Sequence, residues 1–403
     1  MRIIVFVLCF ICFACPPARA GEIVLGAIFE LKGSQAPTAQ EALNGALLAV
    51  KKINSSKDKI KIRLDVESVS GDTTGVLNGV NNLSKSTGII AATGLISEDA
   101  ALAATPAFQA ATLPFMCTGA QADSLSTSGG DIFTLAVPNT RTGQMLAEFA
   151  GNTMQINNII IIRSDLSDSS ARQADGFARR FKKNGGKIMA EIRITEPSPD
   201  LSFVSQKLEE LAPAQNTDSA VVDESVQASN ADDSAAGLDI QKRETEPETP
   251  QVEAVAVFTP PNVAAKVLEQ LKQSKQTYTI LGGTCFDYVS IQKNILEYPA
   301  TIYHAAQASM DRDTPLVHSF IESYKNLFGS SPKTGYAGLG FDSIMLLAAA
   351  QQETSTGIVN ELAKITDFEG VCGKISFQGH SAYKPLYIIQ IESGQKSMAT
   401  ALD

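Results

Sequence analysis

The sequence predicts an α/β protein built from two doubly wound units, and three observations carry this prediction. Strand-like apolar runs alternate with helical stretches along most of the chain, which is the pattern of parallel sheets covered by helices. The chain has 403 residues, so two units are expected rather than one. Its content of 44% apolar and 19% charged residues is that of a globular protein.

The first unit opens with a strand, a loop over 30–38 and a helix. Small and apolar residues from Ala42 to Ile53 recur at helical spacing, and apolar and polar residues alternate from Ile60 to Val66 as in a strand. The strands expected in this unit cover 23–29, 60–66, 89–93, 113–117 and 132–137, and the helices cover 39–54, a stretch opened by 71–73, a stretch from 98, and 139–155.

The second unit starts with a continuous apolar strand over 159–163, a pattern typical of strands buried on both faces. The glycines at 185 and 186 end the helix that follows it. Later in the chain, strands are expected at 187–195, 254–258, 278–282, 301–305, 374–377 and 386–391, the last of which closes a hairpin. The helices expected after residue 163, whichever unit they belong to, are 168–183, 201–211, 262–273, 315–328 and 336–351.

An acidic insertion at 213–250 interrupts this rhythm. It holds nine acidic residues against Lys242 and Arg243, so 2 minus 9 gives a charge of −7, and it has no aromatic residue. This composition is typical of disordered segments. Because it joins a helix to the next strand, it lies at the amino ends of the strands, away from the edge where ligands bind. We expect a solvated tether, with a docking tail for another protein as the alternative.

The first twenty residues have the layout of a secretory signal peptide. A basic start precedes an apolar run over 3–14, and Ala18-Arg19-Ala20 is a small-residue cleavage site. We therefore expect cleavage after Ala20 and a periplasmic protein. A lipid anchor at Cys15 is the alternative, although residues 12–14 match the usual small and aliphatic pattern poorly.

Charge and cysteine content exclude several classes of function. The formal charge of −10 becomes −12 once the two arginines of the signal leave, and an acidic chain without a basic stripe is not expected to bind nucleic acid. Cys117, Cys285 and Cys372 remain, which cannot all pair internally and whose spacing suits no metal site. The common phosphate, hydrolase and zinc motifs are missing from the sequence, so no cofactor, metal or catalytic residue is expected.

The stretch over 88–123 predicts where a ligand would bind. It reads as two parallel strands joined by a helix, so Ser97 and the turn at 118–121 should lie at one sheet edge. Unpaired amides at the start of the helix after Ser97 suit an anionic group. The alternative is that Ser97 merely caps its own helix.

Several segments together resemble the periplasmic binding proteins of the leucine/isoleucine/valine class, the solute receptors of ABC importers. The resemblance covers residues 22–394 apart from the insertion. It rests on the helix start at 41–46, the paired turns at 94–97 and 118–121, and the segments 336–342, 368–377 and 388–394.

This resemblance implies two lobes that are joined by a hinge of three crossings and close on a ligand. Lobe one would hold 22–138 and 306–372, and lobe two would hold 139–305 and 373–403. The partners implied are a small polar or amino-acid-like ligand and the membrane permease of an ABC importer, with the protein a monomer or weak dimer.

The resemblance also implies the ligand-binding residues. Lobe one would hold the ligand's carboxylate and amine through a serine after the third strand and through the turn after the fourth. At the family's aromatic and acidic positions this chain has polar or small residues instead, which favours a polar ligand over a branched aliphatic one. Asp168 and Asp287 are open to another interpretation as helix caps. The expected binding residues are Ser97, Gly119, Ala120, Gln121, Thr38, Asp168, Ser169, Thr259, Cys285 and Asp287.

Two other functions compete with solute transport. One keeps the fold but serves as a ligand sensor or protein-docking domain, such as a periplasmic activator of a cell-wall enzyme, and the acidic insertion favours it. The other is an enzyme, which would need a nucleophile beside a base. Cys117 and Cys285 are the only thiols near the expected cleft, and neither of them has a histidine close by in the predicted arrangement.

Overall fold

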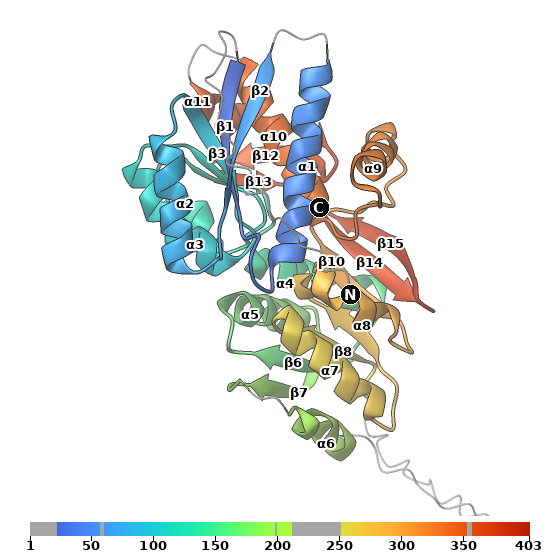
Figure 1. The fold of residues 1–403 in the computed structure, drawn as a ribbon. Coiled ribbons are helices and arrows are strands. Elements are labelled where there is room, and N and C mark those ends of the chain that lie inside the picture. The colour runs from blue at the N-terminus through green and yellow to red at the C-terminus, as the bar shows by residue number, and fades with distance from the viewer. Residues whose placement is uncertain (1–21, 57–59, 198–199, 212–250, 353–356) are drawn as a thin grey trace, which may run out of the picture.

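The computed structural model describes residues 22–56, 60–197, 200–211, 251–352 and 357–403. The expected signal peptide with Cys15 and the acidic insertion at 213–250 lie outside these residues. The described chain forms two α/β lobes, each built on its own twisted sheet, with the two sheets lying one beyond the other along the molecule (Figure 1).

The first lobe contains an eight-stranded sheet covered by helices on both faces. Helices α1 and α10 pack on one face, where Leu25, Ala27 and Phe29 point, and α2 and α3 pack on the other. The sheet order is β11 (Phe368–Gly370), β12 (Gly373–Gln378), β13 (Ser381–Tyr383), β5 (Ile132–Thr134), β4 (Phe115–Cys117), β3 (Ile89–Gly94), β1 (Glu22–Phe29) and β2 (Lys61–Ser68). The helices are α1 (Ala36–Ser55), α2 (Thr73–Lys85), α3 (Glu98–Ala110), α9 (Pro315–Phe328), α10 (Tyr336–Gln352) and α11 (Ile358–Lys364).

Glycines let α1 and α10 approach closely on this face. A Cβ placed on Gly340 would lie 1.8 Å from the carbonyl oxygen of Ala42, and one on Gly45 would lie 1.9 Å from that of Ala337. No side chain fits at such a distance. The backbones of the two helices therefore touch here, which fixes α1 and the loop before it against the rest of the lobe.

The second lobe contains a seven-stranded sheet with the same two-faced cover. Ile159 to Ile162 of β6 are fully buried, as the apolar run predicted, with α6 and α7 on one face and α4 and α5 on the other. The sheet order is β15 (Gln395–Leu402), β14 (Leu386–Glu392), β10 (Ile302–Ala306), β9 (Thr279–Gly282), β8 (Ala254–Phe258), β6 (Asn158–Ser164) and β7 (Lys187–Ile194). The helices are α4 (Asn139–Glu148), α5 (Asp168–Lys183), α6 (Ser202–Leu211), α7 (Pro261–Gln273) and α8 (Gln292–Leu296).

The structure differs from the sequence prediction at the end of the chain. Strands β12 and β13 pair with each other, and β13 pairs with β5 of the first sheet, whereas 373–403 was expected in the second lobe. The hairpin β12–β13 can extend the first sheet because Ser381 lies beside Thr134. The expectation that 386–391 is the final strand is also wrong, since β15 follows it and pairs antiparallel with β14.

Two helices also begin or end elsewhere than expected. Helix α1 starts at Ala36 rather than near residue 39, because Pro37 lies in the first turn, where a missing N–H costs nothing. The helix expected over 139–155 ends as α at Glu148 and continues as one π-helical turn over Phe149–Thr153. The expected strand over 132–137 pairs only to Thr134, because the chain then leaves the first sheet for the second lobe.

Three crossings join the lobes, and side chains tie them together. The side chain of Gln307 accepts a hydrogen bond from the Val137 backbone N–H at 2.8 Å and donates one to the Val137 carbonyl at 3.3 Å. Lys384, in the third crossing, donates its Nζ proton to the Gln307 carbonyl at 2.5 Å and is 1% exposed. Burial lowers the pKa of Lys384. The crossings thus form one connected hinge beside the interface between the lobes.

Candidate functional site

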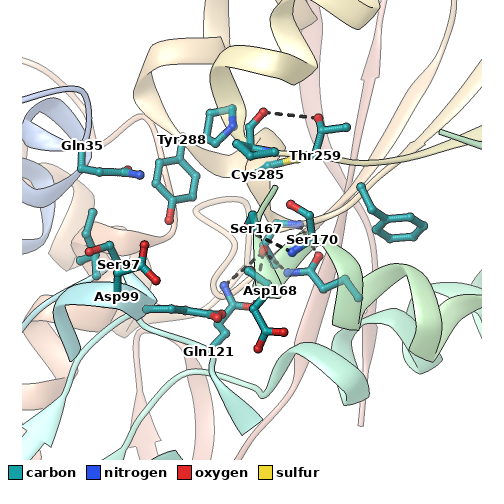
Figure 2. A pocket seen from close by; sticks show the side chains of 18 of the residues that line it. Gln35, Ser97, Asp99, Gln121, Ser167, Asp168, Ser170, Thr259, Cys285 and Tyr288 are labelled. Atoms are coloured by element: carbon teal, nitrogen blue, oxygen red, sulfur yellow. Dashed lines mark hydrogen bonds between the residues drawn. The ribbon is translucent and has the colours of Figure 1, made fainter. Parts of the chain in front are cut away.

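A cavity of about 190 Å³ lies between the lobes, where the carboxyl ends of strands from both sheets face each other. Ser97 and Gln121 follow β3 and β4 of the first lobe, and Thr259 and Cys285 follow β8 and β9 of the second (Figure 2). Open α/β sheets bind ligands at this edge because their loops converge there. Ser97 and the turn at 118–121 therefore lie in one cleft, as the sequence predicted.

On the side of lobe one, the wall is made by the turn after β4 and the start of α3. Only glycine fits at position 119, because a Cβ there would lie 2.8 Å from the ring of Tyr336. Gln121 is 5% exposed, and its amide reaches across the cleft. Ser97 is the N-cap of α3, but its side chain makes no capping hydrogen bond, so the simple capping interpretation is not what the structure shows.

Ser97 and the amide groups beside it instead hold the carboxylate of Glu30. The Ser97 N–H and hydroxyl donate to Glu30 Oε1 at 2.9 and 2.8 Å, and the Ile96 N–H donates to both carboxylate oxygens at 3.1 Å. Glu30 follows β1, the neighbour of β3, and is 1% exposed. Burial raises the pKa of Glu30, and these hydrogen bonds oppose that rise. An internal carboxylate therefore occupies the two N–H groups that directly precede α3, next to the first-turn amides that the sequence analysis considered for an anion.

A second carboxyl group, that of Glu98, lies in the cavity wall next to Ser97. The Asn139 side-chain amide donates to Glu98 Oε1 across the lobes. Burial, with smaller contributions from Asp168 and Asp123, raises the pKa of Glu98 to about 7, although hydrogen bonds with Asn139 and Ser169 oppose the rise. The cavity thus contains a carboxyl group that carries its charge only in part at neutral pH.

The second lobe contributes Asp168 and Ser169 from the start of α5. The hydroxyl of Ser167, the N-cap residue, accepts a hydrogen bond from the Ser170 N–H, which orients this first turn toward the cavity. Asp168 pairs with Arg172 one turn later at 2.6 Å, and both side chains are about half or more exposed. Ser169 donates its hydroxyl proton to Asn139 at 3.0 Å.

Direct hydrogen bonds join the two lobes through the floor of the cavity. Thr284 Oγ1 accepts a hydrogen bond from Gln121 Nε2 of lobe one at 3.1 Å and one from Gln173 Nε2 of lobe two at 2.8 Å. All three residues are at most 5% exposed. At the cavity's edge, the Val289 N–H donates to Thr38 Oγ1 at 3.0 Å. The described conformation is therefore a closed one.

Three of the expected binding residues lie outside the cavity lining. Thr38 is used in the contact with Val289, and Ala120 is buried in the first lobe. Asp287 is buried below the cavity, where it accepts a hydrogen bond from the Gly335 N–H at 3.0 Å. Burial raises the pKa of Asp287 to about 7, and Lys396 at 3.9 Å opposes that rise. It caps no helix, so both sequence interpretations of Asp287 differ from what the structure contains.

The sequence reasoning did not single out Tyr288, Gln35 or Glu98, although all three line the cavity. Figure 2 shows the Tyr288 side chain with its hydroxyl end in the cavity, facing Gln35 and Ser97. Tyr288 was missed because it follows a short 3₁₀ turn rather than a strand. Its position gives the cavity one aromatic wall at a place where none was expected.

The chemistry of the cavity residues favours binding over covalent catalysis. Burial raises the pKa of the Cys285 thiol to about 12, so it stays protonated near neutral pH and is a poor nucleophile. Within the described ranges, no group of three His, Cys, Asp or Glu side chains is placed to hold a metal ion. In the same part of the chain, no helix has the length and apolarity needed to cross a membrane.

Comparisons with solved structures identify the fold. A leucine binding protein, LivK, from Thermotoga maritima is 15% identical, with a TM-score of 0.76 over 94% of this chain and 99% of that one. The LivJ substrate binding protein of Streptococcus pneumoniae, solved with isoleucine, is 21% identical, with a TM-score of 0.75 over 94% and 98%. A solute binding protein of R. palustris, solved with benzoate, is 14% identical, with a TM-score of 0.73 over 94% and 96%.

These structures share the two-lobed fold with this chain. Because their sequence identities are low, the comparison supports the fold and not the ligand. No curated protein sequence matches the chain. The family model described as "Periplasmic binding protein" matches residues 22–396, which is nearly the whole chain after the expected signal peptide. The chain therefore belongs to the periplasmic binding protein family.

Proposed function

We propose that this chain is an extracytoplasmic solute-binding protein that captures a small polar solute between its lobes and delivers it to the membrane permease of an ABC importer. The observation that carries this proposal is the cavity between the lobes, lined by polar side chains from both sheets. The solved relatives whose names describe leucine, isoleucine or benzoate as ligands support it.

Closure around a solute follows from how the cavity is built. Ser97 and Gln121 come from one lobe, and Ser169, Thr259 and Thr284 come from the other, so a solute contacts both groups only when the lobes meet. A ligand shifts a conformational equilibrium by its difference in affinity for the two states. The hydrogen bonds of Gln307 keep the crossings, and so the lobes, connected.

A thermal-shift screen of the mature protein tests this function. Amino acids, amines, amides, organic acids, sugars and nucleobases are each added, and a solute that binds only the folded state raises the melting temperature by mass action. The shift should disappear in a Ser97→Ala plus Gln121→Ala double variant. It should persist in Gln276→Ala, an exposed polar residue between α7 and β9. Absence of any shift in folded, ligand-stripped wild-type protein would contradict the proposal.

One observation favours a second function, that of a ligand sensor or protein-docking domain with the same fold. The amide groups before α3 are occupied by Glu30 rather than open to a solute. A chain that no longer imports a solute would not need them. In that case the screen gives no shift, and the two lobes serve as a surface for another protein.

A further inference from the structure

We infer that the cleft selects a small organic cation without a carboxylate at its lobe-one end, and that Glu30 sets this selectivity. The inference rests on the proposed solute-binding function and names the chemical class of its ligand. It is carried by three features: the occupied amide groups before α3, the charges of the cavity wall, and two hydrogen-bond acceptors on Gln35 and Tyr288.

The first feature occupies the donors that directly precede α3, at the lobe-one end of the cavity. Backbone N–H groups at the start of a helix and a nearby hydroxyl are well suited to an anion. Here the Ile96 and Ser97 N–H groups and the Ser97 hydroxyl all donate to Glu30, at 2.8 to 3.1 Å. A second carboxylate would find these donors taken and would approach a buried group of its own sign. Glu30 thus excludes anions both by occupancy and by charge.

The second feature is that acidic side chains line the cavity with no basic residue among them. Glu98, Asp99 and Asp168 line the wall, and none of the described lining residues is Lys, Arg or His. Arg172 pairs with Asp168 through side chains that are about half or more exposed, and it does not line the cavity. Asp123 adds a further negative charge near Glu98. A cationic ligand would be attracted by this field, because opposite charges at short range attract more strongly in a partly buried cleft than in water, and this offsets the cost of desolvating the cation.

The third feature is a pair of groups that complement N–H donors. Gln35 Oε1 is buried in the cavity wall and accepts no hydrogen bond from the described residues. The Tyr288 side chain lies opposite it in Figure 2. A phenol oxygen accepts hydrogen bonds from charged N–H donors, and a buried acceptor without a partner is stabilised when a ligand donates to it. These groups suit an amine, amidine or guanidine.

A series of probes with one shape and three charges tests this selectivity. Benzoate, benzamide and benzamidinium share a planar ring and differ in the head group, and acetate, acetamide and acetamidinium form a smaller set. Binding to the mature wild-type protein is measured by calorimetry. We expect each amidinium to bind about tenfold or more tightly than the matching carboxylate, because the acidic side chains of the cavity wall attract a cation and repel an anion of the same shape.

Two variants identify Glu30 as the cause. Glu30→Ala frees the donors before α3, so the carboxylate probes should gain about tenfold or more in affinity. Glu30→Gln keeps the position filled without the charge, so the amidinium probes should weaken while the carboxylates stay weak. The conservative variant also covers the case in which Glu30→Ala does not fold, and circular dichroism checks both.

The outcomes separate this inference from the proposed function. Wild-type protein that binds a carboxylate probe as tightly as its amidinium, or binds no amidinium with a Kd below about 1 mM, overturns the cation selectivity. Binding of a neutral or anionic solute in the thermal-shift screen leaves the solute-binding function standing in either case. Equal probe affinities in wild type and both Glu30 variants overturn the role assigned to Glu30.

Discussion

Replacing Thr284 by valine tests whether the hydrogen bonds across the cavity floor hold the lobes closed. Valine keeps the shape of threonine and removes the oxygen that accepts from Gln121 at 3.1 Å and from Gln173 at 2.8 Å. In an open state Gln121 would be solvated, so the loss falls on the closed state. A buried amide left without its acceptor costs about 1–3 kcal/mol.

This cost predicts a specific loss of affinity. If the solute binds only the closed state, a penalty of about 1–3 kcal/mol weakens binding by roughly 5-fold to 150-fold. Calorimetry with a solute from the screen measures it. Thr277→Val is the matched control, since Thr277 is exposed at the opposite end of β9 and should leave the affinity unchanged. An affinity for Thr284→Val within about twofold of wild type, a difference of under ~0.5 kcal/mol, would refute the reasoning.

Three further predictions concern pH, packing and the cavity thiol. Burial raises the pKa of Glu98 from 4.5 to about 7, so between these pH values the folded protein keeps a proton that the unfolded chain has lost. Glu98 therefore destabilises the fold increasingly as the pH rises from about 4.5 to 7. The change in unfolding free energy caused by Glu98→Gln should therefore be more stabilising at pH 8 than at pH 5, by on the order of 3 kcal/mol. Thermal melts that give the same change at both pH values would contradict this. Gly340→Ala should cost about 1–3 kcal/mol or more in urea unfolding, because its Cβ would lie 1.8 Å from the Ala42 carbonyl oxygen, whereas Gly151→Ala, whose nearest neighbour is 4.0 Å away, should change little. In the solute-bound protein Cys285, with a pKa of about 12, should react with iodoacetamide about a hundredfold or more slowly than a model thiol at pH 8, and labelling of the bound form as fast as the model thiol would show that the solute does not hold the closed state.

The sequence predicted most of the fold because apolar periodicity is a local signal. Helices α5 (Asp168–Lys183) and α9 (Pro315–Phe328) lie at the expected residues, since a Ser or Thr N-cap precedes each and a terminator follows. Strand β15 was missed because its alternation of half-buried and exposed residues over Gln395–Leu402 is too weakly apolar to predict a strand. Pairing of β13 with β5 joins segments that are far apart in sequence and carries no local signal.

The candidate site was predicted where a residue lies between the end of a strand and the first turn of the next helix. Ser97, Gly119, Gln121, Asp168, Ser169, Thr259 and Cys285 were expected on that ground and line the cavity. Glu30 also follows a strand, and β1 lies beside β3, so its contact with Ser97 was within reach of the same argument. It was passed over as part of a loop, because nothing in the local sequence shows that its carboxylate turns inward.

Asp287 is the opposite case. Its residue type suggested a ligand contact, but its surroundings in the structure keep it away from the cavity. Its position near the end of β9 and its charge favoured a ligand contact. The structure instead gives it the Gly335 N–H and Lys396 as partners, both from distant segments. Only the packing of the two lobes decides which carboxylates of this chain reach the cavity, and that is not written in any short motif.

Small-angle X-ray scattering of the mature protein tests the central claim, that a solute binds between the lobes and closes them. The profile is recorded without ligand and then with a saturating amount of the tightest solute from the screen. The account predicts a smaller radius of gyration with solute and a profile that matches the closed form described here. Identical profiles for bound and ligand-free protein, together with an unchanged profile for Thr284→Val, would contradict it.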